Sequence, residues 1–590
     1  MAEEKKPEAP AAAPKPPPGP PAPPPPRNPG MVTAVIDGRE VVVKPGTTVI
    51  EAARALGVEI PYYCWHKRLS VAANCRMCLV EMSSSPGGKL QPSCQAPLSE
   101  GVVVKTDTPR VKDQQRATLE FLLLNHPVDC SICDQAGECK LQDYYVQYDA
   151  RPSRLDIPKN VKGKRVELGP TITLDQERCI LCTRCVRFMR EVAKNPQLGV
   201  AQRGTRSAIT AFPGKPLDDR YAGNVVDLCP VGALTSTDFR FRGRVWFMSS
   251  ARSVCAGCSR GCNVSLDFLG STAYRLRPRE NEAVNQEWMC DEGRLGYKAL
   301  NAGRVLSARV GRGPGAAAAT RAEAVAAAAR ALAAAKAQGS GLALLLSPAA
   351  SLEDQLVACH VASQALGLGA VYAGGLADGW HDDFLRRADQ NPNRKGLEVA
   401  AQAYGLTVKP FAELVAAAGA GQIQALWAVG TEVPDAAGAA ALAGLPVLVA
   451  QAVGQGALAE AATVLLPASP HAELDGTFVN FEGRAQRFEA AWHPRGDARP
   501  HFALGAALGQ ALGLPAPWQT AREAWLALSP RIAGVEGWDF KWDSLPSVGR
   551  RKGLLPLAAG TVDGRLAGQR ERLAPEGSEA AERGAAPTSW

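Results

Sequence analysis

The chain contains 16 cysteines, and fifteen of them lie between Cys64 and Cys290, many in Cys-x2-Cys steps. Disulfide frameworks are typical of short secreted proteins, whereas this chain has 590 residues and no secretion signal. Closely spaced thiolates bind soft metal centres such as iron–sulfur clusters and zinc. The spacing therefore predicts metal binding in a reducing compartment.

The first group of cysteines consists of Cys64, Cys75, Cys78 and Cys94. It follows two alternating segments, 32–36 and 40–43, whose Asp-Gly pair predicts a hairpin, and a short predicted helix over 48–56. This order is the plan of plant-type ferredoxins, although the first gap has ten residues instead of the usual four. Four thiolates suit a [2Fe–2S] cluster, and a tetrahedral zinc site with the same ligands is the alternative.

Two further groups have the spacing of [4Fe–4S] ligands. Cys-x2-Cys-x2-Cys followed by a distant Cys-Pro is the bacterial ferredoxin signature, found here at Cys179, Cys182, Cys185 and Cys229. A Cys-x2-Cys-x3-Cys run with a remote fourth cysteine also suits a cubane, and its members are Cys255, Cys258, Cys262 and Cys290. We expect partly solvated arginines to offset the negative charge of the first of these cubanes, at positions 178, 184, 187 and 190.

The remaining group, in "HPVDCSICDQAGEC", has only three cysteines, Cys130, Cys133 and Cys139. It must use another kind of ligand, leave one iron open, or hold no cluster. His126 lies four residues before Cys130, and Pro127 disfavours a helical backbone at His126. Because imidazole can replace thiolate on iron, we take His126 as the fourth ligand. The alternative is an ordinary residue at a helix end.

The last cysteine, Cys359, stands in an apparent helix, "SLEDQLVACHVASQAL", and we expect an inert core residue. Residues 306–557 alternate helical segments such as "RAEAVAAAARALAAAKAQ" with apolar strands such as "ALWAVG" and "PVLVAQAV", which predicts a largely parallel sheet. "GQGALA" formally fits a dinucleotide fingerprint. The next strand, in "ATVLLPAS", begins too soon for a crossover helix, so we expect no nicotinamide binding.

The composition of the ends and the net charge of the chain argue against several classes of protein. The first thirty residues are rich in proline and alanine, which predicts a disordered tail and not a signal peptide. No run of about 18 apolar residues occurs, so we expect no membrane span. The net charge of +8 comes without a block of lysines and arginines, so we expect no nucleic-acid partner.

Four segments carry a close resemblance to a known family. "CWHKRLSVAANCRMCLVE", "HPVDCSICDQAGEC", "RCILCTRCVRF" and "GNVVDLCPVGALTS" are similar in order and spacing to the motifs of the largest iron–sulfur subunit of bacterial NADH–quinone oxidoreductase, respiratory complex I. The resemblance covers about residues 31–245. It implies a [2Fe–2S] cluster on the first group, a histidine-ligated [4Fe–4S] cluster on the second and an all-cysteine [4Fe–4S] cluster on the third. It also implies that the fourth group, present in some members, is not needed for the main electron path.

A second resemblance concerns the α/β domain. "AELDGTFVNFEGRAQRF", Ala472 to Phe488, resembles the signature of the molybdopterin oxidoreductase fold. The resemblance implies that this fold is kept without its cofactor. We expect the domain to be truncated. No cysteine stands where molybdenum would be ligated unless Cys359 does so, and the helical setting of Cys359 argues against that role.

These patterns predict an α/β multidomain protein. Its expected parts are a Pro-rich tail (1–30), a plant-type [2Fe–2S] ferredoxin-like domain (31–110), a [4Fe–4S] segment with one histidine and three cysteine ligands (111–150), a [4Fe–4S] ferredoxin-like domain (151–248), an additional [4Fe–4S] domain (249–305), a molybdopterin-oxidoreductase-like α/β domain without cofactor (306–557) and a flexible tail (558–590).

The resemblance implies an electron-transfer subunit of NADH:quinone oxidoreductase, a proton-translocating complex, without catalytic residues of its own. Electrons would come from a flavin- and NADH-binding subunit to the [2Fe–2S] cluster, pass to the Cys179 group and then to the His126 group, and leave toward quinone. A small [2Fe–2S] subunit and quinone-proximal iron–sulfur subunits would be further partners. The complex would lie on the cytoplasmic side of the bacterial inner membrane, and this chain would reach the membrane only through the complex. The alternatives are the large subunit of an NAD-linked molybdenum formate dehydrogenase and a zinc-bound scaffold.

Overall fold

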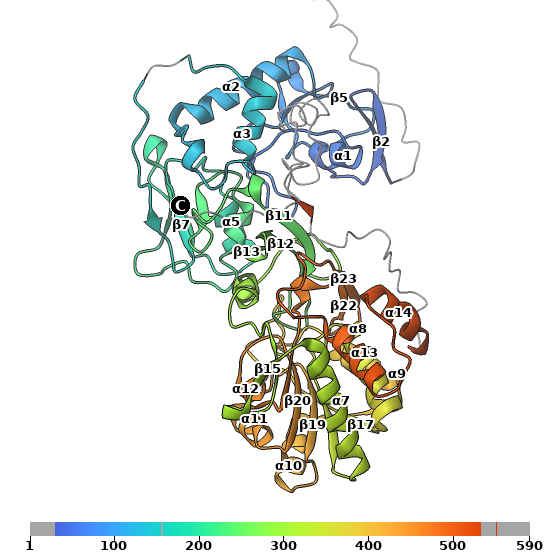
Figure 1. The fold of residues 1–590 in the computed structure, drawn as a ribbon. Helices are drawn as coiled ribbons and strands as arrows, with labels where there is room; N and C mark the ends of the chain where they lie inside the picture. The colour runs from blue at the N-terminus through green and yellow to red at the C-terminus, as the bar shows by residue number, and fades with distance from the viewer. Residues whose placement is uncertain (1–29, 155–156, 533–549, 552–590) are drawn as a thin grey trace, which may run out of the picture. The chain divides into compact units, whose positions relative to one another are not determined.

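The computed structural model describes residues 30–154, 157–532 and 550–551 (Figure 1). The predicted tails, 1–30 and 558–590, lie outside the described residues except for Gly30. Among the described helices, none is long and apolar enough to cross a membrane. The chain divides into two compact units, 1–122 with 144–154 and 123–143 with 155–590, and each is described by itself.

The first unit contains a five-stranded sheet in the order β2-β1-β5-β3-β4. Its strands are β1 Val32–Ile36, β2 Arg39–Val43, β3 Leu79–Met82, β4 Gln91–Pro92 and β5 Val103–Lys105. Asp37 and Gly38, between β1 and β2, have φ of 48° and 80°, as a two-residue type I′ turn requires, so the predicted hairpin is confirmed.

Two helices of this region begin and end where the local sequence predicts. Helix α1, Val49–Ala55, starts after Thr48, whose backbone N–H and hydroxyl both donate to the Glu51 carboxylate at 3.0 and 2.7 Å. Helix α2, Pro109–Asn125, ends directly before His126. Pro127 disfavours a helical conformation at the residue that precedes it, which explains this end.

The iron–sulfur part of the second unit is built from short elements. A three-stranded sheet has the order β10-β7-β6, with β6 Val166–Glu167, β7 Ile172–Leu174 and β10 Leu234–Ser236. Strands β8 Leu198–Ala201 and β9 Ala208–Ala211 form a hairpin. Two helices, α4 Arg184–Glu191 and α5 Asn224–Leu228, complete this part. A second sheet, β13-β12-β11-β24, follows with α6 Asp291–Leu295 (β11 Ser249–Val254, β12 Asn263–Leu269, β13 Thr272–Pro278, β24 Arg550–Arg551).

The α/β domain has an eight-stranded sheet in the order β15-β14-β21-β20-β19-β16-β17-β18. Six neighbouring strands are parallel, namely β21 Val464–Pro467, β20 Val447–Ala452, β19 Ala425–Val429, β16 Leu342–Leu346, β17 Ala370–Ala373 and β18 Thr407–Pro410. β14 Ala308–Val310 and β15 Ala317–Ala319 add an antiparallel edge. The predicted largely parallel sheet is confirmed.

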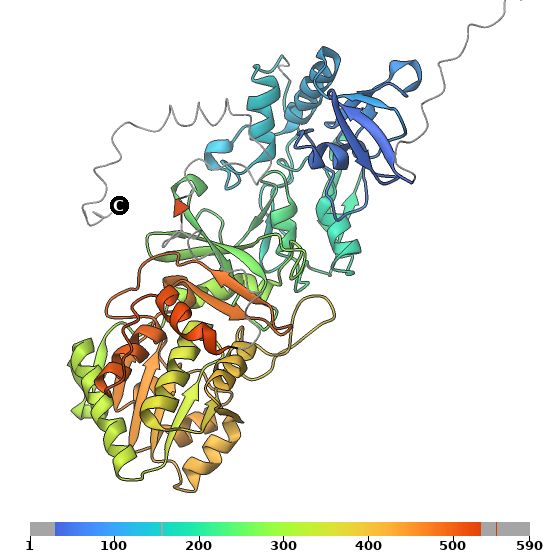
Figure 2. The ribbon, with the colours of Figure 1, turned by 90° about the vertical axis from the view of Figure 1, so that its right-hand side faces the viewer.

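Helices cover both faces of this sheet (Figure 1, Figure 2). One core joins it to α7 Arg321–Ala337, α8 Leu352–Val361, α9 Arg394–Ala403, α13 His501–Ala511 and α14 Ala521–Leu528. The other joins it to α10 Phe411–Gly419, α11 Ala436–Ala443 and α12 Ala457–Ala461. We expected no room for a helix before β21. This expectation is wrong, because α12 lies between β20 and β21, although it has only five residues.

Candidate metal centres

The first group comes from three loops of the first unit. Cys64 follows α1, Cys75 and Cys78 precede β3, and Cys94 follows β4, and all but Cys75 are buried. Hydrogen bonds from the Cys75 and Cys94 side chains lower the pKa of the Cys64 thiol, and the same bond to Cys64 raises the pKa of Cys75. A bond from Cys94 lowers the pKa of Cys78 to about 7. The four sulfurs therefore converge, as one cluster would require.

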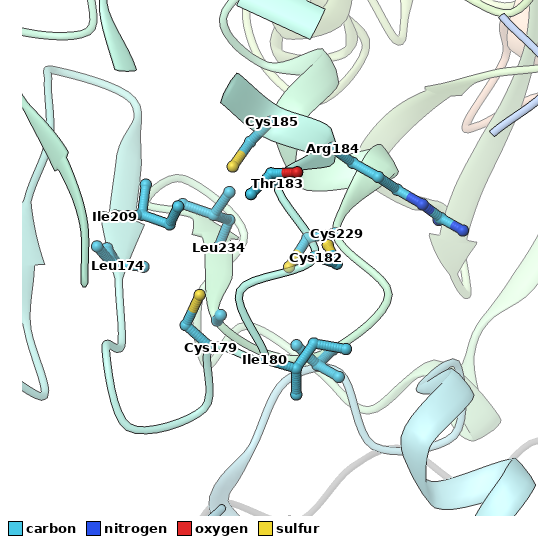
Figure 3. Close-up of a pocket in the computed structure, with 12 residues that line it drawn as sticks. Leu174, Cys179, Ile180, Cys182, Thr183, Arg184, Cys185, Ile209, Cys229 and Leu234 are labelled. Atoms are coloured by element: carbon cyan, nitrogen blue, oxygen red, sulfur yellow. The ribbon is translucent and has the colours of Figure 1, made fainter. Parts of the chain in front are cut away.

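The third group surrounds one small cavity (Figure 3). Its members are Cys179, Cys182, Cys185 and Cys229. Leu181 and Thr183 have φ of 54° and 59°, so the backbone curls around the site before α4 begins. Burial raises the pKa of Cys179 to about 12 and that of Cys229 to about 11. Thiols in this setting stay protonated unless a positive centre replaces the protons, which fits an iron–sulfur cluster.

The arginines beside this group are not placed as we expected. Arg178, Arg184 and Arg187 are only 4%, 5% and 5% exposed. Arg184 and Arg187 donate to the carbonyls of Leu228 and Cys182 at 3.2 and 3.1 Å. The prediction of partly solvated arginines is wrong for these three, because protein oxygens replace water around their guanidinium groups; the side chain of Arg190 is exposed.

The second group lies on the segment that follows α2. Cys130 belongs to a short 3-10 turn, Cys130–Ile132, while Cys133 and Cys139 are buried. Burial raises the pKa of the Cys139 thiol to about 12. Gly137 has φ of 85°, a conformation that lets the chain turn between the last two cysteines.

His126 has the properties of a neutral ligand. Its Nδ1 is buried and has no hydrogen-bond partner among the described residues. Burial lowers the pKa of the imidazole to about 4, so the ring is neutral at pH 7. Neutral imidazole is the form that binds metals, and a buried nitrogen without a partner is costly. These observations favour a metal ligand over a helix-end residue.

The loop that follows Cys229 of the third group packs directly against the second group. A Cβ placed on Gly232, three residues after Cys229, would stand 2.2 Å from Cys133 Sγ. The Lys140 N–H, next to Cys139, donates to the Pro230 carbonyl at 3.0 Å. Only a glycine lets the loop behind Cys229 approach Cys133 this closely, so the fold places the two candidate centres side by side.

Arg178 connects the same two groups by charge. It directly precedes Cys179, and its guanidinium pairs with Asp129, the residue before Cys130, at 2.7 Å and with Asp175 at 3.3 Å. Burial works against its charge, but the bond to Asp129 and the nearby Cys133 raise its pKa above the usual value. A fixed cation therefore lies between two sites that each gather thiolates.

The fourth group is buried throughout. Cys255 follows β11, Cys262 precedes β12, and Cys290 begins α6, where its sulfur accepts the Gly293 N–H at 3.3 Å. A Cβ on Gly293 would stand 3.0 Å from Cys255 Sγ and 3.3 Å from Cys290 Sγ, so these sulfurs converge. Cys258 completes the set, and burial raises the pKa of Cys255 to about 12.

A buried asparagine links the third and fourth groups. Asn224 begins α5, which leads to Cys229, and its amide donates to the Met289 carbonyl at 2.8 Å. The Met289 N–H donates in return to the Asn224 side-chain oxygen at 3.1 Å. Because Met289 precedes Cys290, this pair of bonds fixes the distant fourth ligands of both groups against each other.

Cys359 is fully buried on α8 within the apolar core, which confirms the prediction of a core residue. Among the described residues, no three His, Cys, Asp or Glu side chains converge like ligands of a single metal ion. The four thiolates of a cubane bind four different irons and are spread over its corners.

Five family models match successive parts of the chain. They are the 2Fe-2S iron-sulfur cluster binding domain (30–109), the NADH-ubiquinone oxidoreductase-G iron-sulfur binding region (115–154), the NADH-quinone oxidoreductase subunit 3 ferredoxin-like domain (169–235), the molybdopterin oxidoreductase Fe4S4 domain (248–302) and molybdopterin oxidoreductase (294–511). The matches confirm the predicted fold class, an α/β multidomain protein with [2Fe–2S], [4Fe–4S] and molybdopterin-oxidoreductase parts.

Curated relatives match about half of the chain. An NADH-quinone oxidoreductase subunit of Rickettsia bellii, the one designated G, is 42% identical over 276 residues, which are 47% of this chain and 40% of that protein. The NADH-ubiquinone oxidoreductase 75 kDa subunit of Reclinomonas americana is 44% identical over 276 residues, 47% of this chain and 39% of that protein. The chain is thus a homologue of this complex I subunit over about half its length, and it spans about two fifths of these relatives.

A solved chain, described as the crystal structure of NAD+-reducing [NiFe]-hydrogenase in the H2-reduced state, is 30% identical and covers 36% of this chain and 91% of that chain. Its TM-score of 0.33 is too low to support an argument.

The approach of Gly232 to Cys133 predicts a sharp effect of one methyl group. Gly232→Ala would place the Cβ 2.2 Å from the sulfur, so we expect loss of the second cluster, about four irons per chain. Gly199→Ala is the control, because its nearest atom would be 3.7 Å away. Iron and acid-labile sulfide per chain are measured in both variants. An iron content in Gly232→Ala equal to that of the unaltered protein would contradict the assigned contact.

Proposed function

We propose that this chain is an iron–sulfur electron-transfer subunit of an NADH:quinone oxidoreductase. The observation that carries the proposal is the contact between the second and third groups, where Gly232 meets Cys133. Two candidate redox centres held against each other serve electron transfer, while a zinc scaffold has no need of such contact. Homology to the iron–sulfur subunit of complex I over about half the chain supports the same function.

We assign one cluster to each group of ligands. Cys64, Cys75, Cys78 and Cys94 would hold a [2Fe–2S] cluster. His126, Cys130, Cys133 and Cys139, then Cys179, Cys182, Cys185 and Cys229, and finally Cys255, Cys258, Cys262 and Cys290 would each hold a [4Fe–4S] cluster. Such clusters supply reversible one-electron transfer, so no side chain of the protein has to act as acid, base or nucleophile.

The protein's own residues set the surroundings of these centres. Apolar side chains such as Leu174, Ile209 and Leu234 line the third site and exclude water. Backbone N–H groups donate to sulfur, as from Leu181 to Cys179 at 3.4 Å and from Gly293 to Cys290 at 3.3 Å. Hydrogen bonds to sulfur and low solvent exposure are the means by which proteins set cluster potentials.

In the proposed direction of transfer, the first group receives electrons from a flavin- and NADH-binding subunit. In the proposed order, electrons then pass to the third group and from it to the His126 group, which releases them toward quinone. The further partners would be a small [2Fe–2S] subunit and quinone-proximal iron–sulfur subunits. We place the complex at the cytoplasmic side of the bacterial inner membrane, which this chain would reach only through its partners.

A molybdenum-dependent formate dehydrogenase subunit is the second candidate, because two molybdopterin oxidoreductase models match 248–302 and 294–511. Cys359, the one cysteine after Cys290, lies on α8 and is 0% exposed within an apolar core. This placement makes Cys359 unsuitable as a molybdenum ligand and favours the electron-transfer subunit.

Metal analysis separates the candidates. The proposed set of one two-iron and three four-iron clusters requires about fourteen irons and as many labile sulfides per chain, with no molybdenum. We expect a visible absorption band at about 400 nm that dithionite bleaches, as iron–sulfur clusters show. Near-stoichiometric molybdenum would instead support the dehydrogenase, and a colourless zinc protein would support the scaffold.

The fourth group offers a test of the electron path. Cys258→Ser should remove one [4Fe–4S] EPR signal and leave most NADH–quinone turnover, because we place this group outside the main path. The parallel change Cys182→Ser, in the third group, should abolish turnover. Turnover is measured on fully assembled complexes. Loss of turnover in the assembled Cys258→Ser complex would place the fourth cluster on the main electron path.

The ligand assignment of His126 has a redox test. Replacing imidazole by thiolate adds a negative charge, so His126→Cys should keep the cluster and lower its midpoint potential. His126→Ala should leave one iron open and give a labile or three-iron cluster. The exposed His381, changed to alanine, is the control. An EPR-monitored titration that is unchanged in both His126 variants would remove His126 from the ligands.

A further inference from the structure

Arg386 is a buried cation whose donors are only partly used. It lies in the loop between β17 and α9 of the α/β domain and is 1% exposed. Its Nη2 donates to Glu292 Oε1 at 2.9 Å and to Gln390 Oε1 at 3.4 Å. Its Nε and Nη1 have no hydrogen-bond partner among the described residues. Buried charged donors without acceptors are strongly destabilising, so an acceptor is expected beside them.

The unpartnered Nη1 lies next to the fourth cysteine group. A Cβ placed on Gly257 would stand 3.3 Å from Arg386 Nη1 and 3.5 Å from Cys255 Sγ, so both atoms border the same point. A guanidinium stays protonated in proteins, so Arg386 is charged here. The side chain thus brings a fixed positive charge to a site of converging thiolates.

The loop that carries Arg386 is held firmly against this site. The Asp382 carboxylate accepts the backbone N–H of Arg386 at 3.0 Å and the Tyr221 hydroxyl at 2.6 Å. From the cysteine side, Arg260 donates to the carbonyls of Leu385 and Phe384 at 3.2 and 3.0 Å. Arg386 is therefore positioned in advance by residues next to the fourth group.

We propose that Arg386 Nη1 donates a hydrogen bond to a sulfur of the [4Fe–4S] cluster held by Cys255, Cys258, Cys262 and Cys290, and that this bond raises the reduction potential of that cluster. The inference rests on the proposed ligation. Reduction adds one negative charge, so a fixed cation stabilises the reduced state more than the oxidised state. The α/β domain thereby acts as a positioning partner of the fourth centre.

The test uses the full-length chain, purified anaerobically with its clusters. Arg386→Met keeps much of the side-chain length and removes the charge and the donors, whereas Arg386→Lys keeps the charge. Arg330→Met, at an exposed position of α7, is the matched control. We expect Arg386→Met to lower the midpoint potential of the fourth cluster in an EPR-monitored titration, Arg386→Lys to restore part of the shift, and Arg330→Met to change nothing.

A spectroscopic measurement on the unaltered protein keeps the test independent of variant folding. With 15N-labelled arginine, pulsed EPR of the reduced fourth cluster should show a coupled 15N nucleus and an exchangeable proton, both absent from Arg386→Met. If Arg386→Met cannot hold the cluster, the presence or absence of 15N coupling in the unaltered protein decides whether an arginine contacts the cluster.

Two different failures can be told apart. About ten irons per unaltered chain, without a fourth cluster signal, would overturn the ligation by Cys255, Cys258, Cys262 and Cys290 and this inference with it. A normal fourth cluster with no 15N coupling, or with the same midpoint potential in Arg386→Met, would overturn the role of Arg386 alone.

Discussion

The structure depends on holding sulfur charge in buried surroundings. Burial raises the pKa of Cys139, Cys179 and Cys255 to about 12, so these thiols keep their protons unless a positive centre replaces them. The elements around the third group are short: β7 has three residues, α5 has five and α4 has eight. In our proposal, metal binding and folding are coupled in this part of the chain, because a cluster bound here would hold these short elements together.

The same constraint accounts for the buried arginines. An all-cysteine cubane is anionic, and Arg178, Arg184 and Arg187 lie buried beside the third group while carbonyls and carboxylates share their charge. Arg178 also pairs with Asp129 of the neighbouring segment, so one cation stabilises the packing of two candidate centres. A lysine would not reproduce this arrangement, because the planar guanidinium presents several donors at fixed angles to several acceptors.

Features that depend on neighbouring residues could be predicted from the sequence. The Asp-Gly hairpin and the end of α2 before Pro127 follow from local geometry, and the apolar strands predicted the parallel sheet. Features that depend on tertiary contacts could not. The sequence "CPVGAL" contains Gly232, but nothing nearby shows that it faces Cys133 about a hundred residues earlier. The burial of the arginines was missed for the same reason, since their acceptors lie on other segments.

In our proposal the fourth group holds a cluster outside the main electron path, and its contacts give that cluster a structural role. Asn224 joins its last ligand to the third group, and the loop around Arg386 joins it to the α/β domain. Strands β11, β12 and β13 form part of a small sheet before α6, and the sulfurs of Cys255 and Cys290, which flank β12 and β13 in the sequence, lie close together. A cluster here would cross-link three parts of one unit whether or not electrons pass through it. Loss of this cluster would then disturb the packing first. While the cluster is bound, Arg386 of the α/β domain would balance part of its negative charge.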